Sequence, residues 1–239
     1  QAVRRPRLPL RKALPSMVTS AGLIFGFLSM LAATEAEYDS AVYLLVAAVF
    51  CDLFDGQLAR RLQATSRFGQ QLDSLSDALS FGAAPAFLVY QALLRPLGPW
   101  GMAAALVYVM AGVLRLARFN TRAAQDKRYF EGLPSPSAAA VVAAFVWFSS
   151  TWRGPGGLTD LILAFGVTAL AGALMVSSFP YMSLKQIDVD KRVRYYYFIV
   201  VPLFLALIAI DPPTMLLAMF VTYALSAPVQ WVVRRMRRL

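Results

Sequence analysis

Residues 52–77 read DLFDGQLARRLQATSRFGQQLDSLSD and contain four of the 13 acidic residues of the chain. The four are Asp52, Asp55, Asp73 and Asp77. The stretch joins two long apolar runs, so its first half predicts the end of one membrane helix and its second half the start of the next. The first two aspartates are three residues apart and the last two are four apart, so each pair shares one helix face. Because residues 61–68 form a short connection, we expect antiparallel neighbours and four carboxylates converging on one pocket.

Carboxylates at membrane depth are costly to ionise, which makes these four functional candidates with a cation as the expected partner. Like charges at close range disfavour one another, and one or two bound divalent ions would resolve the conflict. The chain has no histidine and one cysteine, Cys51. This excludes catalytic systems that need histidine, and zinc held by histidine. The expected metal is a hard cation bound by oxygen, namely magnesium, manganese or calcium.

The composition predicts an all-α, polytopic membrane helical bundle. Of the 239 residues, 59% are hydrophobic, against about 45–50% in ordinary soluble domains, and the mean hydropathy is +0.58. We expect about eight transmembrane helices, at residues 17–34, 40–60, 70–94, 99–119, 135–152, 159–181, 195–210 and 213–233. The expected organisation is a basic arm at 1–16, a six-helix catalytic core at 17–181, two additional helices within 195–233 and a basic tail at 234–239.

The net charge of +10 is distributed in a way that argues for membrane topology and against nucleic-acid binding. All lysines and arginines except Arg95 and Arg153 fall in the two terminal segments or in alternate loops. The positive-inside rule therefore places both termini, and the aspartates, on the cytoplasmic side of the cytoplasmic membrane. The first span is longer than a signal-peptide core, so we expect a retained helix. The basic arm before it either lies on anionic headgroups or serves only as a topology signal.

The aspartates belong to a longer pattern. The sequence matches D-x-x-D-G-x-x-A-R-x(8)-G-x-x-x-D-x-x-x-D at every fixed position from Asp52 to Asp77. With this pattern the chain resembles the CDP-alcohol phosphotransferase family. The resemblance implies six transmembrane helices around a polar pocket open to the cytoplasm. It also implies aspartates that bind one or two divalent ions, Mg²⁺ or Mn²⁺, which hold the pyrophosphate of a CDP-linked donor.

The resemblance also implies a role for each matching residue. Asp52, Asp55 and Asp73 would be metal ligands, and Asp77 would take the proton of the acceptor hydroxyl and also contact a metal. The other positions would form the binding site for the CDP donor: Gly56, Ala59 and Gly69 leave room for it and Arg60 meets its phosphate charge. Close helix packing is the alternative reason for the three small residues.

Residues Pro15 to Thr19 resemble the Pro-Asn-x-x-Thr segment that this family places near the cytidine. Ser16 stands where the family has asparagine, while Thr19 matches and is expected to bind the donor. The alternative for Thr19 is a hydrogen bond to the backbone of its own helix.

Three further stretches resemble the phosphatidylserine synthase branch of the family. They are residues 72–86, residues 114–120 and the run EGLPSP at 131–136. The branch implies transfer of a phosphatidyl group from CDP-diacylglycerol to L-serine with release of CMP. Glycerol phosphate or inositol phosphate as acceptor, or an archaeal ether-lipid donor, are the alternatives within the enzyme class. A cation channel or transporter is the alternative from another class, although the aspartates cluster at one membrane side instead of lining a path across it.

Arg115 and Arg118 are three residues apart at the end of the fourth span, so we expect both to point the same way. Together they would clamp the carboxylate of serine or a phosphate, with Asn120 as a polar neighbour. The alternative is that both arginines fix topology and extend to the interface. Ser135 and Pro136 predict a helix N-cap followed by a first-turn proline. We further expect a homodimer.

Overall fold

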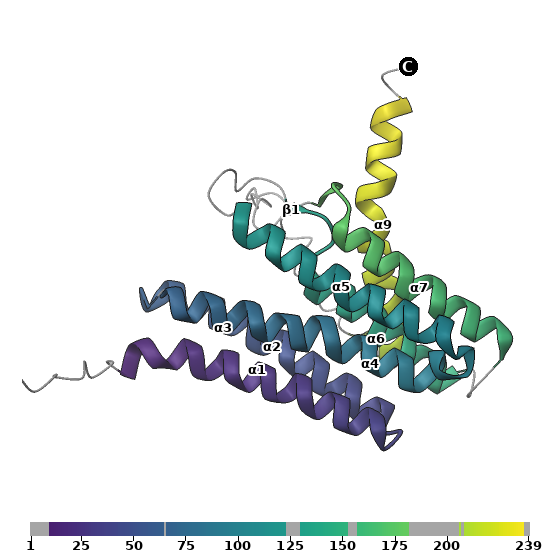
Figure 1. Cartoon of the computed structure of the whole chain (residues 1–239), viewed down its shortest axis with the longest axis horizontal. Coiled ribbons are helices and arrows are strands. Elements are labelled where there is room, and N and C mark those ends of the chain that lie inside the picture. The colour runs from purple at the N-terminus through teal and green to yellow at the C-terminus, as the bar shows by residue number, and fades with distance from the viewer. Residues whose placement is uncertain are drawn as a thin grey trace, which may run out of the picture.

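The computed structural model describes residues 10–64, 66–122, 130–152, 157–181, 206 and 208–236. Figure 1 shows long helices packed side by side, with α9 running past the others toward the C-terminus. The α-helices are α1 (Leu10–Thr34), α2 (Tyr38–Arg61), α3 (Arg67–Asp77), α4 (Ala84–Val89), α5 (Pro99–Arg122), α6 (Ser135–Trp152), α7 (Leu158–Val176) and α9 (Pro212–Met236). Two π-helical segments, η1 (Ala78–Ala83) and η2 (Tyr90–Leu94), and the 3₁₀ turn η3 (Arg95–Leu97) continue α3 and α4. Two short strands, β1 (Phe130–Glu131) and β2 (Pro180–Tyr181), pair antiparallel.

The predicted all-α membrane bundle is confirmed. Within the described part, six helical segments are long and apolar enough to cross a membrane. They are Ala13–Thr34, Tyr38–Arg61, Arg67–Leu97, Pro99–Thr121, Leu158–Val176 and Pro212–Val233. The predicted span at 135–152 is helical, as α6, but it is not among these six segments. Most of its residues are buried among the other helices. The predicted span at 195–210 lies for most of its length outside the described residues, as do most of the basic arm and the end of the tail.

Two predicted boundaries are wrong. α1 begins at Leu10, so the last part of the predicted arm is already helical. α7 ends at Val176 instead of continuing to 181. Proline disfavours the helical conformation in the residue that precedes it. Pro180 belongs to strand β2, so the helix ends before it.

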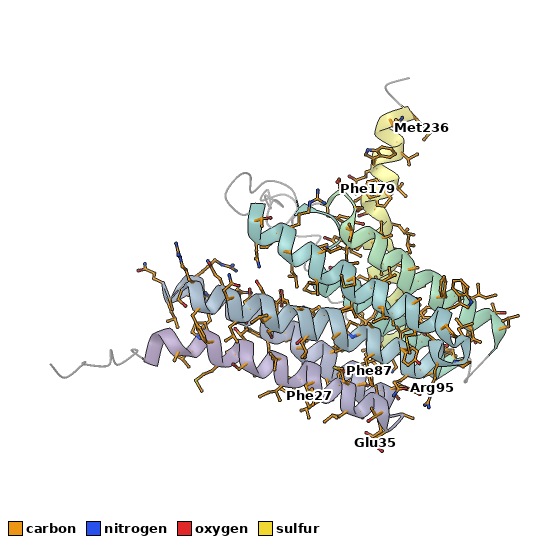
Figure 2. The ribbon with its side chains drawn as sticks, in the orientation of Figure 1. Phe27, Glu35, Phe87, Arg95, Phe179 and Met236 are labelled. Carbon is orange, nitrogen blue, oxygen red and sulfur yellow. The ribbon has the colours of Figure 1, made fainter. Side chains whose placement is uncertain are left out.

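Apolar side chains cover the outside of the bundle as well as its interior. Phe27 on α1 is 49% exposed and points away from the other helices in Figure 2. A surface of this kind fits hydrocarbon rather than water. Glu35 and Arg95 both lie at the end of the bundle at which α1 turns into α2 (Figure 2).

The π-helical segment η1 follows from one residue, Pro85. Proline has no backbone N–H, so the carbonyl of Phe81, four residues earlier, loses its usual helical donor. The hydroxyl of Tyr108 on α5 donates to that carbonyl at 3.2 Å. Tyr108 is fully buried. A wider turn, which begins directly after Asp77, and a tyrosine from a neighbouring helix thus compensate for the missing N–H of Pro85.

We expect Tyr108→Phe to destabilise the bundle by about 0.5–1.5 kcal/mol, because the buried Phe81 carbonyl loses its hydrogen bond from the Tyr108 hydroxyl. The thermal unfolding midpoint in detergent measures this. Tyr43→Phe is the matched control, since Tyr43 is 59% exposed. Equal midpoints for the two variants would show that the Tyr108 hydroxyl does not satisfy this carbonyl.

Residues 130–133 fasten the end of α7. Gly132 has φ +80°, and a Cβ there would lie 2.4 Å from the carbonyl oxygen of Met175. Only glycine tolerates both conditions. The N–H of Gly132 donates to the carbonyl of Phe179 at 3.0 Å, and the N–H of Leu133 donates to the carbonyl of Leu174 at 2.9 Å. This contact fixes where α6 begins, two residues later.

Candidate active site

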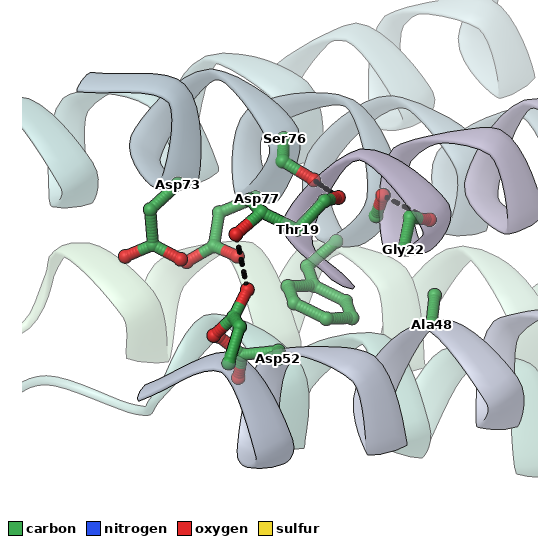
Figure 3. A pocket seen from close by; sticks show the side chains of 10 residues that line it. Thr19, Gly22, Ala48, Asp52, Asp73, Ser76 and Asp77 are labelled. Atoms are coloured by element: carbon green, nitrogen blue, oxygen red, sulfur yellow. Dashed lines mark hydrogen bonds between the residues drawn. The ribbon is translucent and has the colours of Figure 1, made fainter. Parts of the chain in front are cut away.

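Three carboxylates from two helices meet at one point. Asp52 and Asp55 of α2 and Asp73 of α3 each offer one oxygen, and these oxygens lie within 4.8 Å of one another. Asp77 lines the same pocket. Figure 3 shows Asp73 and Asp77 reaching from one helix toward Asp52 on the other. The structure therefore brings together all four aspartates that the sequence analysis singled out.

The turn between α2 and α3 makes this meeting possible. α2 ends at Arg61, and the hydroxyl of Ser66 accepts a hydrogen bond from the N–H of Gly69 at 3.0 Å. This is an N-cap, and it starts α3 directly after the reversal. The short connection keeps the two aspartate pairs at the same depth.

The pocket between the aspartates is small. It encloses about 10 Å³, enough for an ion or one water molecule and far too little for a nucleotide. It is lined by Thr19, Gly22, Ala48, Asp52, Asp55, Asp73, Ser76, Asp77, Ser80 and Phe81. A larger ligand would have to lie on the open side of the carboxylates.

Thr19 touches the acidic cluster directly. Its hydroxyl lies 2.6 Å from Oδ2 of Asp55 and 3.0 Å from the carbonyl oxygen of Pro15 on its own helix. The side chain is 6% exposed. The shorter distance is typical of a hydroxyl that donates to a charged carboxylate. Sequence analysis missed this contact because it joins α1 to α2 across 36 residues.

We expect Thr19→Val to weaken divalent-ion binding by roughly tenfold to a hundredfold, as loss of a partner that orients a metal ligand does. Titration of the metal-stripped protein with Mn²⁺, followed by electron paramagnetic resonance, measures the affinity. Thr168→Val is the matched control, because the Thr168 hydroxyl is buried and donates within its own helix to Ala164 at 2.7 Å. The same Mn²⁺ affinity in both variants would mean that Thr19 does not orient Asp55.

α1 packs closely against the helix that carries Asp73 and Asp77. Ser76 donates to the Thr19 carbonyl and Ser80 to the Gly22 carbonyl, both at 3.2 Å. A Cβ on Gly26 would lie 2.5 Å from the Ser80 hydroxyl. Sequence analysis missed this contact, although the spacing of Gly22 and Gly26 is a common signal for close approach of membrane helices.

The three small residues of the sequence pattern have different surroundings. A Cβ on Gly56 would have only Nη1 of Arg60, at 3.7 Å, within 4 Å. Close helix packing therefore does not explain Gly56. A Cβ on Gly69 would lie 3.2 Å from the capping hydroxyl of Ser66. The helix cap is therefore a local reason for a residue without a side chain at position 69. Ala59 is half-buried and Arg60 is exposed.

Arg115 and Arg118 have separate partners. Nη1 of Arg115 donates to the hydroxyl of Ser135 at 2.8 Å, and its charge lies close enough to Asp77 to interact with it. Arg118 donates from Nη1 to the carbonyl of Val176 and from Nη2 to the hydroxyl of Ser178, both at 3.3 Å. Arg118 therefore binds the C-terminal end of α7, where a positive charge is favourable.

Asn120 and Ser135 differ from expectation in their contacts. Nδ2 of Asn120 donates to the hydroxyl of Ser74 at 3.0 Å, which ties α5 to α3 next to Asp73. Ser135 is the first residue of α6 and 1% exposed. Its hydroxyl accepts from Nη1 of Arg115, so this side chain connects α5 to α6. The N–H of Ala138 donates to the Pro134 carbonyl at 2.9 Å, so Pro134 is the N-cap and the predicted N-cap at Ser135 is wrong.

Comparison with known proteins extends the picture. A family model described as CDP-alcohol phosphatidyltransferase matches residues 12–180. The chain belongs to this family. The match covers α1 to α7 and includes every aspartate of the cluster.

Individual relatives agree with the family assignment. The chain is 32% identical to a CDP-diacylglycerol–serine O-phosphatidyltransferase of Helicobacter pylori, over 91% of the chain and 90% of the relative. It is 34% identical to an enzyme of the same name from Bacillus subtilis, over 72% of the chain and 92% of the relative. It is also 35% identical to an archaetidylserine synthase of Methanothermobacter thermautotrophicus, over 71% of the chain and 69% of the relative.

The acidic cluster fits the divalent cations that this family uses. Three carboxylate oxygens within 4.8 Å of one another can share one ion, and oxygen donors suit a hard cation. Asp55 is 5% exposed, which is costly for an unneutralised carboxylate. The described part of the chain thus has the donors for a metal at this position.

Proposed function

We propose that this protein is a phosphatidylserine synthase. It transfers the phosphatidyl group of CDP-diacylglycerol to the hydroxyl of L-serine and releases CMP. The grouping of Asp52, Asp55 and Asp73 beside Asp77 carries the proposal for the reaction. The names of relatives that align with nearly the whole chain support serine as the acceptor.

Asp52, Asp55 and Asp73 would hold one or two divalent ions, Mg²⁺ or Mn²⁺. When bound, such ions neutralise the pyrophosphate of the donor and stabilise the departing CMP. Asp77 contributes to the same pocket without belonging to the three closest carboxylates. It takes the proton of the serine hydroxyl as the hydroxyl oxygen attacks phosphorus, and contacts a metal when one is bound.

The donor lies on the open side of the cluster. Gly56 leaves its backbone accessible there, with only the end of Arg60 nearby, and Arg60 supplies positive charge for phosphate. Ala59 and Gly69 flank the same surface, and Thr19 acts on the donor through Asp55. Holding donor phosphorus and acceptor oxygen in line removes much of the entropic barrier to the reaction.

Arg115 binds the carboxylate of serine. Its charge interacts with that of Asp77, which supports an acceptor held by Arg115 with its hydroxyl beside the proposed base. Arg118 and Asn120 hold α7 and α3 in place around this site, through Val176 and Ser74. A single guanidinium then faces the acceptor, and not the pair that the sequence spacing predicts.

The site faces the cytoplasm, and both termini lie on that side. The alternating distribution of lysine and arginine supports this orientation. The catalytic core comprises residues 17–181, with two additional helices within 195–233 and a basic tail at 234–239. The basic arm at 1–16 precedes the core, and its last residues belong to α1, which begins at Leu10. The family match at 12–180 supports this division. We further propose a homodimer, which size-exclusion chromatography with light scattering would test.

The reaction can be tested with purified protein in detergent. CDP-diacylglycerol is supplied with serine, glycerol phosphate or inositol phosphate in separate reactions, and CMP release is measured. We expect CMP release, with formation of phosphatidylserine, in the reaction that contains serine and in neither of the other two. Product with another alcohol and none with serine would contradict the acceptor assignment. Metal uptake into proteoliposomes without CMP release would instead favour a cation transporter.

The archaetidylserine synthase relative makes an ether-lipid donor the second candidate. The same reaction with a CDP-linked diether lipid in place of CDP-diacylglycerol decides between them. We expect the diacyl donor to be the better substrate. A higher kcat/KM for the diether donor would favour the second candidate.

A further inference from the structure

The helix α1 determines how far apart the two aspartate helices lie. α1 packs against both α2 and α3, whereas α2 and α3 pack far less against each other. The carboxylates of α2 and of α3 nevertheless have to meet at one point, with oxygens within 4.8 Å of one another. The separation across the acidic cluster therefore depends on the contacts that α1 makes with each of the two helices.

One side of α1 makes these contacts. Thr19, Gly22 and Gly26 follow the spacing i, i+3, i+7, so they lie on one helix face. A Cβ on Gly22 would lie 3.2 Å from the Cβ of Cys51 on α2, and one on Gly26 would lie 2.5 Å from the hydroxyl of Ser80 in η1. Small residues allow helix backbones to approach closely in a membrane. This face of α1 thus fits tightly against both neighbours.

Thr19 is the residue at which the contacts with the two helices meet. Its hydroxyl binds Oδ2 of Asp55 on α2 at 2.6 Å, and its carbonyl accepts from the hydroxyl of Ser76 on α3 at 3.2 Å. Ser76 is 5% exposed, and it lies between Asp73 and Asp77 on α3. Figure 3 shows Thr19 with its hydrogen bond to Ser76 beside the carboxylates. One turn of α1 therefore connects the two aspartate pairs.

The direction of the Ser76 hydroxyl is a property of this packing. A serine inside a helix often donates to the carbonyl four residues earlier in its own helix. Ser74 on α3 does so, with the carbonyl of Gln70 as acceptor at 3.0 Å. Ser76 on the same helix instead donates to the backbone of α1. Its hydroxyl thus fastens α3 to α1 within the lining of the acidic pocket.

We propose that Ser76 is a positioning residue, which holds α3 on the Thr19 carbonyl and thereby sets the distance between the carboxylates of α2 and α3. This inference rests on the proposed function, in which these carboxylates share a divalent ion. Such an ion binds most tightly when the two helices already have the right separation, because none of the binding free energy is then needed to move them. Ser76 acts through Asp73 and not on the substrates.

The test is Ser76→Ala, which removes the hydroxyl and introduces a good helix former. Titration of metal-stripped protein with Mn²⁺, followed by electron paramagnetic resonance, measures the affinity for the ion. We expect this affinity to fall roughly threefold to tenfold, as for the loss of one hydrogen bond between uncharged groups. At saturating Mn²⁺ the kcat for CMP release should equal that of wild type, because the bound ion then holds the carboxylates together.

Ser29→Ala is the matched control. Ser29 of α1 is fully buried, and its hydroxyl donates to the Ala41 carbonyl of α2 at 2.8 Å. The same kind of bond between helices is lost there, about 15 Å further along α1 than Thr19. Both alanine variants should lower the thermal unfolding midpoint to a similar extent. Only Ser76→Ala should weaken Mn²⁺ binding.

Gly22→Ala tests the same role by a steric route. Its added Cβ presses on Cys51 of α2 and shifts α1 without removing a hydrogen bond, so Mn²⁺ binding should weaken here too. Unchanged Mn²⁺ affinity in Ser76→Ala or in Gly22→Ala, or an equal loss in Ser29→Ala, would overturn the positioning role. A kcat of Ser76→Ala that stays low at saturating Mn²⁺ would also overturn it. Wild-type protein that binds Mn²⁺ but forms no phosphatidylserine would instead overturn the proposed function.

Discussion

Asp77→Asn is expected to lower the turnover number by about 10²- to 10⁴-fold, the usual contribution of a general base. The amide keeps the size of the carboxylate but cannot accept the hydroxyl proton of the acceptor. Because Asp52, Asp55 and Asp73 remain, the variant should still bind the CDP-linked donor with nearly wild-type affinity. CMP release measures turnover, and equilibrium binding of radiolabelled CDP-diacylglycerol in detergent measures affinity.

Asp39→Asn is the matched control for this substitution. Asp39 lies in the first turn of α2 and is exposed, at the other end of the helix from Asp52. The same chemical change there should leave CMP release unchanged. Normal turnover in Asp77→Asn would remove Asp77 from the role of base.

Gly56→Leu is expected to raise the KM for CDP-diacylglycerol by about 10- to 100-fold, as forcing a large side chain into occupied space does. In the free protein a Cβ there has only Nη1 of Arg60 within 4 Å. Leucine is also a better helix former than glycine, so the unfolding midpoint should stay the same or rise. Weaker donor binding without loss of stability is the combination that a donor-facing glycine predicts.

Gly166→Leu provides the control for size. A Cβ on Gly166 in α7 has no atom within 4 Å, so the substitution meets open space as well. Its donor KM should match wild type. If Gly56→Leu shows unchanged donor affinity, or loses both affinity and stability, Gly56 has a packing role instead.

The acidic cluster could be predicted from sequence because its cause is local. Helical spacing puts Asp52 with Asp55 and Asp73 with Asp77, and the short connection leaves one way to bring the pairs together. Hydrophobic length predicts most helix positions for the same reason. The end of α7 at Val176 is different, because Pro180 follows it in strand β2. That strand pairs with β1, about 50 residues earlier in the chain, and helical length does not predict such a pairing.

The surroundings of the cluster could not be predicted in the same way. Equal spacing suggests a fork of Arg115 and Arg118, but spacing says nothing of which neighbouring helix each side chain meets. Arg118 finds the end of α7 and Arg115 finds Ser135. The contact of Thr19 with Asp55 likewise depends on how α1 docks on α2. Such interhelical contacts are set by packing, which one sequence does not specify residue by residue.

The central claim is that carboxylates of α2 and α3 hold the divalent ions needed for phosphatidyl transfer. The most direct test is CMP release from CDP-diacylglycerol and serine by metal-stripped protein as Mn²⁺ is added back, in wild type and in Asp52→Asn. We expect no release without metal, full recovery in wild type with added Mn²⁺, and no recovery in Asp52→Asn at the same concentration. Full turnover by the metal-stripped wild-type protein, or equal recovery in Asp52→Asn, would contradict the claim.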